Sequence, residues 1–198
     1  MTLTQPQRIG IFIVLALVMA GTRINHFSAL PDASWVVFFA AGFYLRGSMR
    51  WAFPALIALA VLLDFLVING QGLNFWSHYC VSPGYWFLAA AYAAMWLGGS
   101  LLRTQASGPR LRTLGLLVPS FLVAEALCFL ISNGSFYWTS AAVASPSLAG
   151  WIGNMGDWYL PYLRTSAMYL CIGTGVHIIA ARWLNLLADP AQIHGQRG

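Results

Sequence analysis

Charged side chains are scarce in this chain. Only 8% of its 198 residues are charged, whereas a soluble domain typically carries about 25%. Hydrophobic residues make up 59%, and the mean hydropathy is +0.69. This composition leaves too little polar surface to face water. It excludes an ordinary soluble domain and predicts an integral membrane protein.

Lysine is absent, and all ten basic residues are arginine. The net charge of +5 might be expected of a protein that binds nucleic acid. The arginines, however, lie in the gaps between apolar runs and are not clustered with exposed aromatics on a polar face. We therefore expect no nucleic-acid partner, and we interpret the arginines as topology signals.

Cysteine is rare as well, with Cys80, Cys128 and Cys171 as the whole set. The set offers neither a disulfide framework nor a CxxC metal pair. Cys128 and Cys171 lie inside apolar runs, where a free cysteine usually only packs. Cys80 alone lies outside a run. No P-loop motif is present, so we expect no ATP site in this chain.

Long apolar runs dominate what remains. A helix of roughly 20 apolar residues spans the hydrocarbon core of a bilayer. The sequence predicts an all-α integral membrane protein with one domain, 1–198. Its six spans are expected at 6–24, 34–50, 52–69, 84–103, 113–132 and 158–187. Pro6 is a candidate first-turn proline and Ser34 a candidate N-cap.

The distribution of arginine sets the expected orientation. Eight arginines flank the spans on one side, namely Arg8, Arg46, Arg50, Arg103, Arg110, Arg112, Arg182 and Arg197. Arg23 and Arg164 fall on the other side. The positive-inside rule then places both termini in the cytoplasm and the loops 25–33, 70–83 and 133–157 outside. Val18-Met19-Ala20 also allows a cleaved signal peptide, but we favour an uncleaved first span.

The outer loops combine amides, aromatic residues and titratable groups, as a ligand pocket does. An interfacial aromatic belt explains part of the set but not the amides, which gather on one side. The 133–157 loop is too aromatic for a disordered linker, and we expect it to fold back as a lid. The candidate binding residues are His26, Asn69, Trp76, His78, Tyr79, Tyr85, Tyr137, Trp138, Asp157, Tyr162 and Arg164.

Cys80 is the strongest candidate for chemistry. A thiolate is a soft metal ligand or a nucleophile, although Cys80 could also simply pack as a small buried hydrophobe. His78 would point the same way on an extended loop, as a metal ligand, as a base for Cys80 or as a structural hydrogen-bonding group. The His-x-Cys pair does not complete a tetrahedral zinc site.

Ionisable residues inside the spans are functional candidates by default. Asp64 is expected near the pocket floor. Glu125 lies deeper and could pair with Arg164 or with the neighbours of Asp64 through hydrogen bonds, although a satisfied structural contact is an alternative for both acids. Small residues at Ala16 and Ala20 in the first span form a candidate helix-docking face.

These features together resemble a known family. Six spans, cytoplasmic termini, three outer loops and the Ala16–Ala20 spacing are similar to the substrate-binding S components of energy-coupling-factor vitamin transporters. Within that group, Cys80 in the aromatic loop before the fourth span resembles the BtuM family, often called solitary S components, of Gram-negative bacteria. The similarity covers nearly the whole chain, but its specific part is Cys80.

The resemblance implies a cobalamin-binding uptake protein of the bacterial inner membrane, with its site facing the periplasm. It implies Cys80 as an axial cobalt ligand with the cobalamin base displaced, and slow removal of cyanide from cyanocobalamin. Amide, tyrosine and arginine side chains, including Arg23 or Arg164, would bind the corrin amides and phosphate. A transmembrane coupling protein and two ATPases are possible partners at Ala16 and Ala20.

Two other functions are consistent with the residues. The first is an outer-face Cys-His hydrolase or acyltransferase, which would need Asp157 or Asn154 as a third, orienting group. The second is a haem-binding membrane protein that uses His26, His78 or His177. It ranks lower because only His177 lies clearly within a span.

Overall fold

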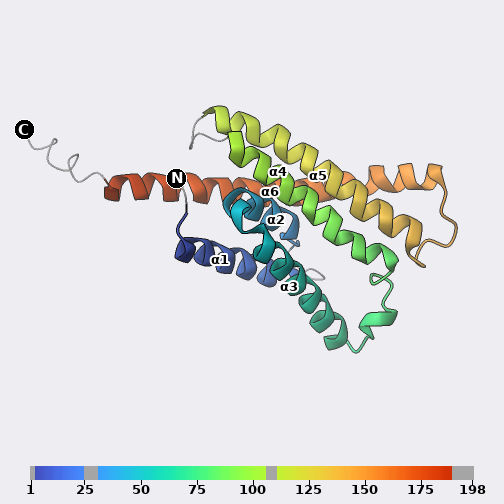
Figure 1. Cartoon of the computed structure of the whole chain (residues 1–198). Helices are drawn as coiled ribbons and strands as arrows, with labels where there is room; N and C mark the ends of the chain where they lie inside the picture. The colour runs from blue at the N-terminus through green and yellow to red at the C-terminus, as the bar shows by residue number, and fades with distance from the viewer. Residues whose placement is uncertain (1–2, 25–30, 106–110, 189–198) are drawn as a thin grey trace, which may run out of the picture.

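Helices form every regular element of the computed structural model, which describes residues 3–24, 31–105 and 111–188 (Figure 1). No strand occurs in those ranges. The α-helices are α1 (Gln5–Arg23), α2 (Ser34–Tyr44), α3 (Met49–Gly70), α4 (Leu88–Gln105), α5 (Leu111–Thr139) and α6 (Leu148–Ala188). Short 3-10 helices lie between them, namely η1 (Arg46–Ser48), η2 (Phe75–Ser77) and η3 (Pro83–Phe87).

Four helical stretches in the described part of the chain are long and apolar enough to cross a membrane. They are Gln5–Arg23, Arg46–Gly70, Pro83–Gln105 and Arg112–Thr139. The described residues are all-helical, and these four stretches are consistent, by length and composition, with the predicted helical membrane bundle. The 11 residues of α2 rise about 16 Å, which is roughly half of a 30 Å hydrocarbon core. The 41-residue α6 is long enough but falls outside this set.

Three predicted boundaries are wrong. The second span was expected over 34–50, but α2 ends at Tyr44, and η1 turns the chain into α3. The 133–157 loop is mostly helix, since α5 continues to Thr139 and α6 begins at Leu148. Gly134 costs only about 1 kcal/mol in a helix, too little to end one, so the break falls instead in the Ser- and Pro-containing stretch 140–147. The predicted lid is therefore replaced by a short connection.

The start signals also differ in detail. At α1, the backbone N–H of Thr4 donates to the side chain of Gln7 at 2.9 Å, and Pro6 lies in the first turn, as expected. At α2, Ser34 is not the N-cap but the first helical residue. The carboxylate of Asp32 accepts the backbone N–H of Ser34 at 2.9 Å, so Asp32 supplies the capping oxygen.

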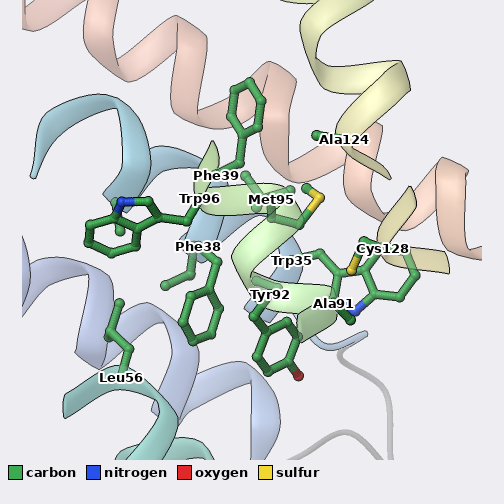
Figure 2. Packing of buried hydrophobic residues seen from close by; sticks show 14 of the residues in the cluster. Trp35, Phe38, Phe39, Leu56, Ala91, Tyr92, Met95, Trp96, Ala124 and Cys128 are labelled. Atoms are coloured by element: carbon green, nitrogen blue, oxygen red, sulfur yellow. The ribbon is translucent and has the colours of Figure 1, made fainter. Parts of the chain in front are cut away.

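The core lies where α2 packs against α4. Figure 2 shows Phe38 and Phe39 of α2 beside Tyr92 and Trp96 of α4. The rings of Phe38 and Tyr92 are stacked, with centroids 4.3 Å apart. The two backbones approach so closely that a Cβ at Gly42 would collide with the carbonyl of Trp96, so glycine is required at this crossing.

Two ends of the bundle can be distinguished. At the arginine-rich end, Arg8 donates to Ser48 at 3.5 Å, and the hydroxyl of Tyr44 is 2.6 Å from Nδ1 of His177. At the opposite end, which we call the loop end, α3 leads through η2 and η3 into α4, and α5 connects to α6 (Figure 1). This end carries the candidate site.

Candidate functional site

Arg23, the last residue of α1, is the centre of a buried charged network at the loop end. Its Nε and Nη2 donate to the two carboxylate oxygens of Asp64 on α3, at 2.7 and 2.6 Å. Its Nη1 donates to Asp32 at 2.8 Å, to Ser34 at 3.0 Å and to the hydroxyl of Tyr92 at 3.1 Å. Because Arg23 is only 6% exposed, these charge-assisted bonds replace its hydration almost completely.

The two carboxylates of the network are also satisfied. The hydroxyl of Tyr85 on η3 donates to Asp64 at 2.6 Å. The hydroxyl of Ser34 donates to Asp32 at 2.6 Å. One arginine pairs with two carboxylates, so one net negative charge remains. The hydrogen bonds from these neutral hydroxyl groups stabilise that charge. The network thereby joins α1, α2, α3, α4 and η3 at one point beneath the loop.

A small cleft opens beside this network. Its polar wall consists of Arg23, Tyr85 and Tyr92, and Trp86 lies at its edge with α3 residues Ile57, Ala60 and Val61 and with Leu88 and Ala89. Its volume is about 40 Å³, close to the roughly 30 Å³ that one water molecule occupies in the liquid.

The loop 71–82 is fixed on the end of α5 through a tight glycine contact. A Cβ at Gly84 would lie 2.6 Å from Oγ1 of Thr139 and 2.7 Å from the carbonyl oxygen of Ser135, so no larger residue fits. The hydroxyl of Ser135 donates to the carbonyl of Gly84 at 3.2 Å. The hydroxyl of Ser140 donates to the carbonyl of Tyr79 at 3.3 Å. These contacts hold the segment on both sides of Cys80.

The Cys80 thiol is partly buried within this loop. Burial raises its pKa, hydrogen bonding by the Tyr79 side chain lowers it, and the negative charge of Asp64 raises it. Cys80 is therefore within electrostatic reach of the Arg23 network. Nδ1 of His78 accepts the backbone N–H of Cys80 at 3.3 Å and so orients the loop.

Aromatic residues cover the same end of the molecule. Tyr162 on α6 stacks on Trp35 of α2, with ring centroids 5.0 Å apart. The hydroxyl of Tyr137 donates to the carbonyl of Ser147 at 3.2 Å and closes the connection between α5 and α6. Trp138 lies 6.4 Å from Trp151, centroid to centroid. Tyr162 is also within electrostatic reach of Asp32 and Cys80.

Other predicted residues stay apart from the network. Trp76, Asp157 and Arg164 are exposed. Oδ1 of Asn69 accepts the backbone N–H of Phe75 at 3.4 Å, a loop contact. His26 lies outside the described residues.

The interior acid on α5 does not form the predicted pair. Glu125 is fully buried, and within the described structure neither of its oxygens has a hydrogen-bond partner of standard geometry. The suggested partner Arg164 is exposed on α6. The nearest electrostatic neighbours of Glu125 are Tyr159 on α6 and Cys128 one turn along α5.

The small residues of α1 face partly inward. Ala16 packs against the core together with Phe12 and Leu15. The outward surface of α1 carries larger residues, namely Ile9, Ile13, Val14, Leu17 and Val18. Docking of another protein at Ala16 and Ala20 stays a prediction.

Sequence reasoning missed the two residues that complete the network. Tyr92 is not among the residues that the sequence singles out, and Ser34 is predicted only as a cap. One signal was available, because an arginine at the end of an apolar helix needs a polar partner wherever it is buried. The sequence did not show which helix faces would meet.

The described residues contain no group of three or more histidine, cysteine or acidic side chains placed to hold a metal ion. Comparison with protein-family models and with characterised proteins finds no match for this chain.

Proposed function

We propose that this chain is a membrane protein that binds cobalamin at its loop end and takes it inward, with the Cys80 sulfur as an axial ligand of cobalt. The observation that carries the proposal is the position of Cys80. Its thiol is partly buried, lies on a loop fixed to α5 and is within electrostatic reach of a charged network. A thiolate is a soft metal ligand, and a single thiolate is sufficient for a cobalt ion whose equatorial positions are already filled by a corrin ring.

The chemistry expected at Cys80 is a ligand exchange without a change in oxidation state. The thiol loses its proton, and the sulfur lone pair takes the position of the dimethylbenzimidazole base on Co(III). In cyanocobalamin the donating sulfur weakens the opposite cobalt–carbon bond. Cyanide then leaves with its electron pair, takes up the thiol proton as hydrogen cyanide, and water fills the vacated position.

Ligand entry requires the loop 71–82 to separate from α5. The cleft of about 40 Å³ admits no corrin ring, and the hydroxyls of Ser135 on α5 and of Ser140 just after it hold Gly84 and Tyr79 in place. Partners for the corrin amides and phosphate are then available in Tyr85, Tyr162 and Arg164. Transport across a bacterial inner membrane, with or without a coupling protein and ATPases, belongs to the same proposal.

Absorption spectroscopy tests this function directly. Hydroxocobalamin or cyanocobalamin added to the purified protein should show the spectrum of a thiolate-bound, base-off corrinoid. Cys80→Ala should abolish this change, whereas Cys171→Ala, which removes an exposed thiol on α6, should retain it. An unchanged spectral shift in Cys80→Ala contradicts cobalt ligation. A growth experiment extends the test to uptake. In a strain that lacks its own inner-membrane cobalamin importer, the parent protein should restore growth on cobalamin, and Cys80→Ala should not.

A Cys-His hydrolase has less support from the geometry. Nδ1 of His78 is occupied by the backbone N–H of Cys80, not by its thiol. Asp157, proposed as the orienting acid, is exposed. A bis-histidine haem site has similarly little support, because His177 is hydrogen-bonded to Tyr44 at the opposite, arginine-rich end.

A further inference from the structure

Glu125 is the buried ionisable group that the proposed cobalamin site does not use. It is 0% exposed at the middle of α5, a helix apolar enough to cross the membrane. Neither carboxylate oxygen has a hydrogen-bond partner of standard geometry among the described residues. An unpaired ionised carboxylate in such surroundings costs many kcal/mol, so the group is expected to carry a proton there.

Among the described residues, the groups in electrostatic contact with Glu125 do not include a cation. On α5 its titratable neighbour is Cys128, and on α6 it is Tyr159. On α4, Tyr92 is within electrostatic reach of Cys128 but accepts a hydrogen bond from Arg23. The only titratable residue of α2, Tyr44, is bonded to His177 at the arginine-rich end.

Tyr159 is the residue through which Glu125 on α5 interacts with α6. Tyr159 lies on α6 and is partly exposed, and its ring contacts Phe129 on α5, with centroids 5.2 Å apart. Gly156 and Gly153, about one and two turns before Tyr159, are exposed, and a Cβ at either position would meet open space. A shift of α6 would separate Tyr159 from Glu125 and would also break the stacking of Tyr162 on Trp35 of α2.

We propose that Glu125 is a proton-binding site through which inward movement of the ligand is coupled to a proton. With α6 in place the carboxyl group is enclosed and protonated, and displacement of α6 hydrates it and releases the proton. An acid within a membrane span commonly serves such a relay. The coupling to ligand movement rests on the proposed cobalamin function, whereas the protonated state of Glu125 does not.

Infrared spectroscopy of the ligand-free protein in lipid tests the proton site alone. The parent protein should show the carbonyl band of a protonated carboxyl group at neutral pH. Glu125→Gln should lose that band, and Ser132→Ala, on the same helix, should keep it. A parent spectrum without the band, or a band that persists in Glu125→Gln, overturns the proton site whether or not cobalamin binds.

Uptake of hydroxocobalamin into proteoliposomes tests the coupling. If one proton moves with each ligand, a pH gradient of about one unit should change accumulation about tenfold. Glu125→Gln should remove this response while keeping the Cys80-dependent spectrum, and Glu125→Asp should restore it. An equal response in parent and Glu125→Gln overturns the coupling. Absence of the Cys80-dependent spectrum in the parent instead refutes the cobalamin function and, with it, the coupling.

Discussion

The Arg23 network and Glu125 are two buried ionisable sites that this fold treats in opposite ways. Around Arg23, each carboxylate oxygen of Asp32 and Asp64 accepts at least one hydrogen bond. Around Glu125, neither oxygen has a partner of standard hydrogen-bond geometry in the described structure, and the Tyr159 hydroxyl is its polar neighbour. The first site joins four helices to the 3-10 helix that follows the Cys80 loop, whereas the second is enclosed largely by apolar side chains.

The Arg23 network uses its charges to stabilise the structure, whereas Glu125 is a group that can gain or lose a proton. A fully satisfied ion pair resists any change that removes one partner, because the others are then left buried and unpaired. An unpaired acid is stable only as the neutral form and responds to any movement that hydrates it. Substitutions at the two sites should therefore affect stability in opposite directions.

The largest effect is expected from Arg23→Met. This change leaves the partly buried Asp32 and Asp64 without a cation and should lower the free energy of unfolding by about 3 kcal/mol, the lower end of the range for a buried pair. The measurement is denaturant or thermal unfolding in detergent or bilayers. Arg50→Met, at an exposed arginine, is the matched control and should change stability little. Equal effects of the two substitutions would contradict a structural network.

Tyr85→Phe should weaken the same network less. It removes one hydroxyl that donates to the Asp64 carboxylate at 2.6 Å, a charge-assisted bond contributing about 1.5–3 kcal/mol. In addition, η3 should loosen, so protease cleavage in the 71–82 loop should accelerate. Tyr169→Phe, which loses a bond to the carbonyl of Pro31, serves as the control. An unchanged unfolding midpoint and cleavage rate in Tyr85→Phe would indicate that Asp64 does not depend on Tyr85.

Glu125→Leu should have the opposite sign. It replaces a buried acid without partners by an apolar residue of similar size, and should raise the free energy of unfolding by about 1 kcal/mol. The same unfolding assay measures it, beside Arg23→Met. A loss of several kcal/mol would show that Glu125 has a partner and would remove the contrast between the two sites.

The sequence predicted a large part of this fold, and the reasons lie in particular residues. Apolar runs defined the four membrane-length stretches because their signal is long and continuous. Ser- and Gly-containing residues 133–139 were interpreted as a loop because local composition outweighed the helix that continues through them. The turn after Tyr44 was missed because apolar residues continue on both sides of Arg46-Gly47-Ser48.

The sequence predicted several residues of the site, but it did not predict which of them contact one another. Asp64 was expected near the pocket floor, and it lies beneath the loop, bonded to Tyr85. Its pairing with Arg23 depends on the rotation of α1 against α3, which no local pattern specifies. The expected pairing of Glu125 with Arg164 failed for the same reason, since Arg164 faces outward from α6.

The smallest effect concerns the thiol above the network. Burial raises the pKa of Cys80, and hydrogen bonding by Tyr79 lowers it, so Tyr79→Phe should raise this pKa further. If Cys80 ligates cobalt as proposed, only its deprotonated sulfur does so, and binding should strengthen as the pH rises and level off above the thiol pKa. The affinity curve of Tyr79→Phe should be displaced to higher pH by less than about one unit, equivalent to less than about 1.4 kcal/mol. Spectroscopic titration with hydroxocobalamin across pH measures the displacement, with Tyr169→Phe as the control. A displacement to lower pH would mean that the Tyr79 hydroxyl stabilises the protonated thiol, which is the opposite of the predicted effect on the pKa of Cys80.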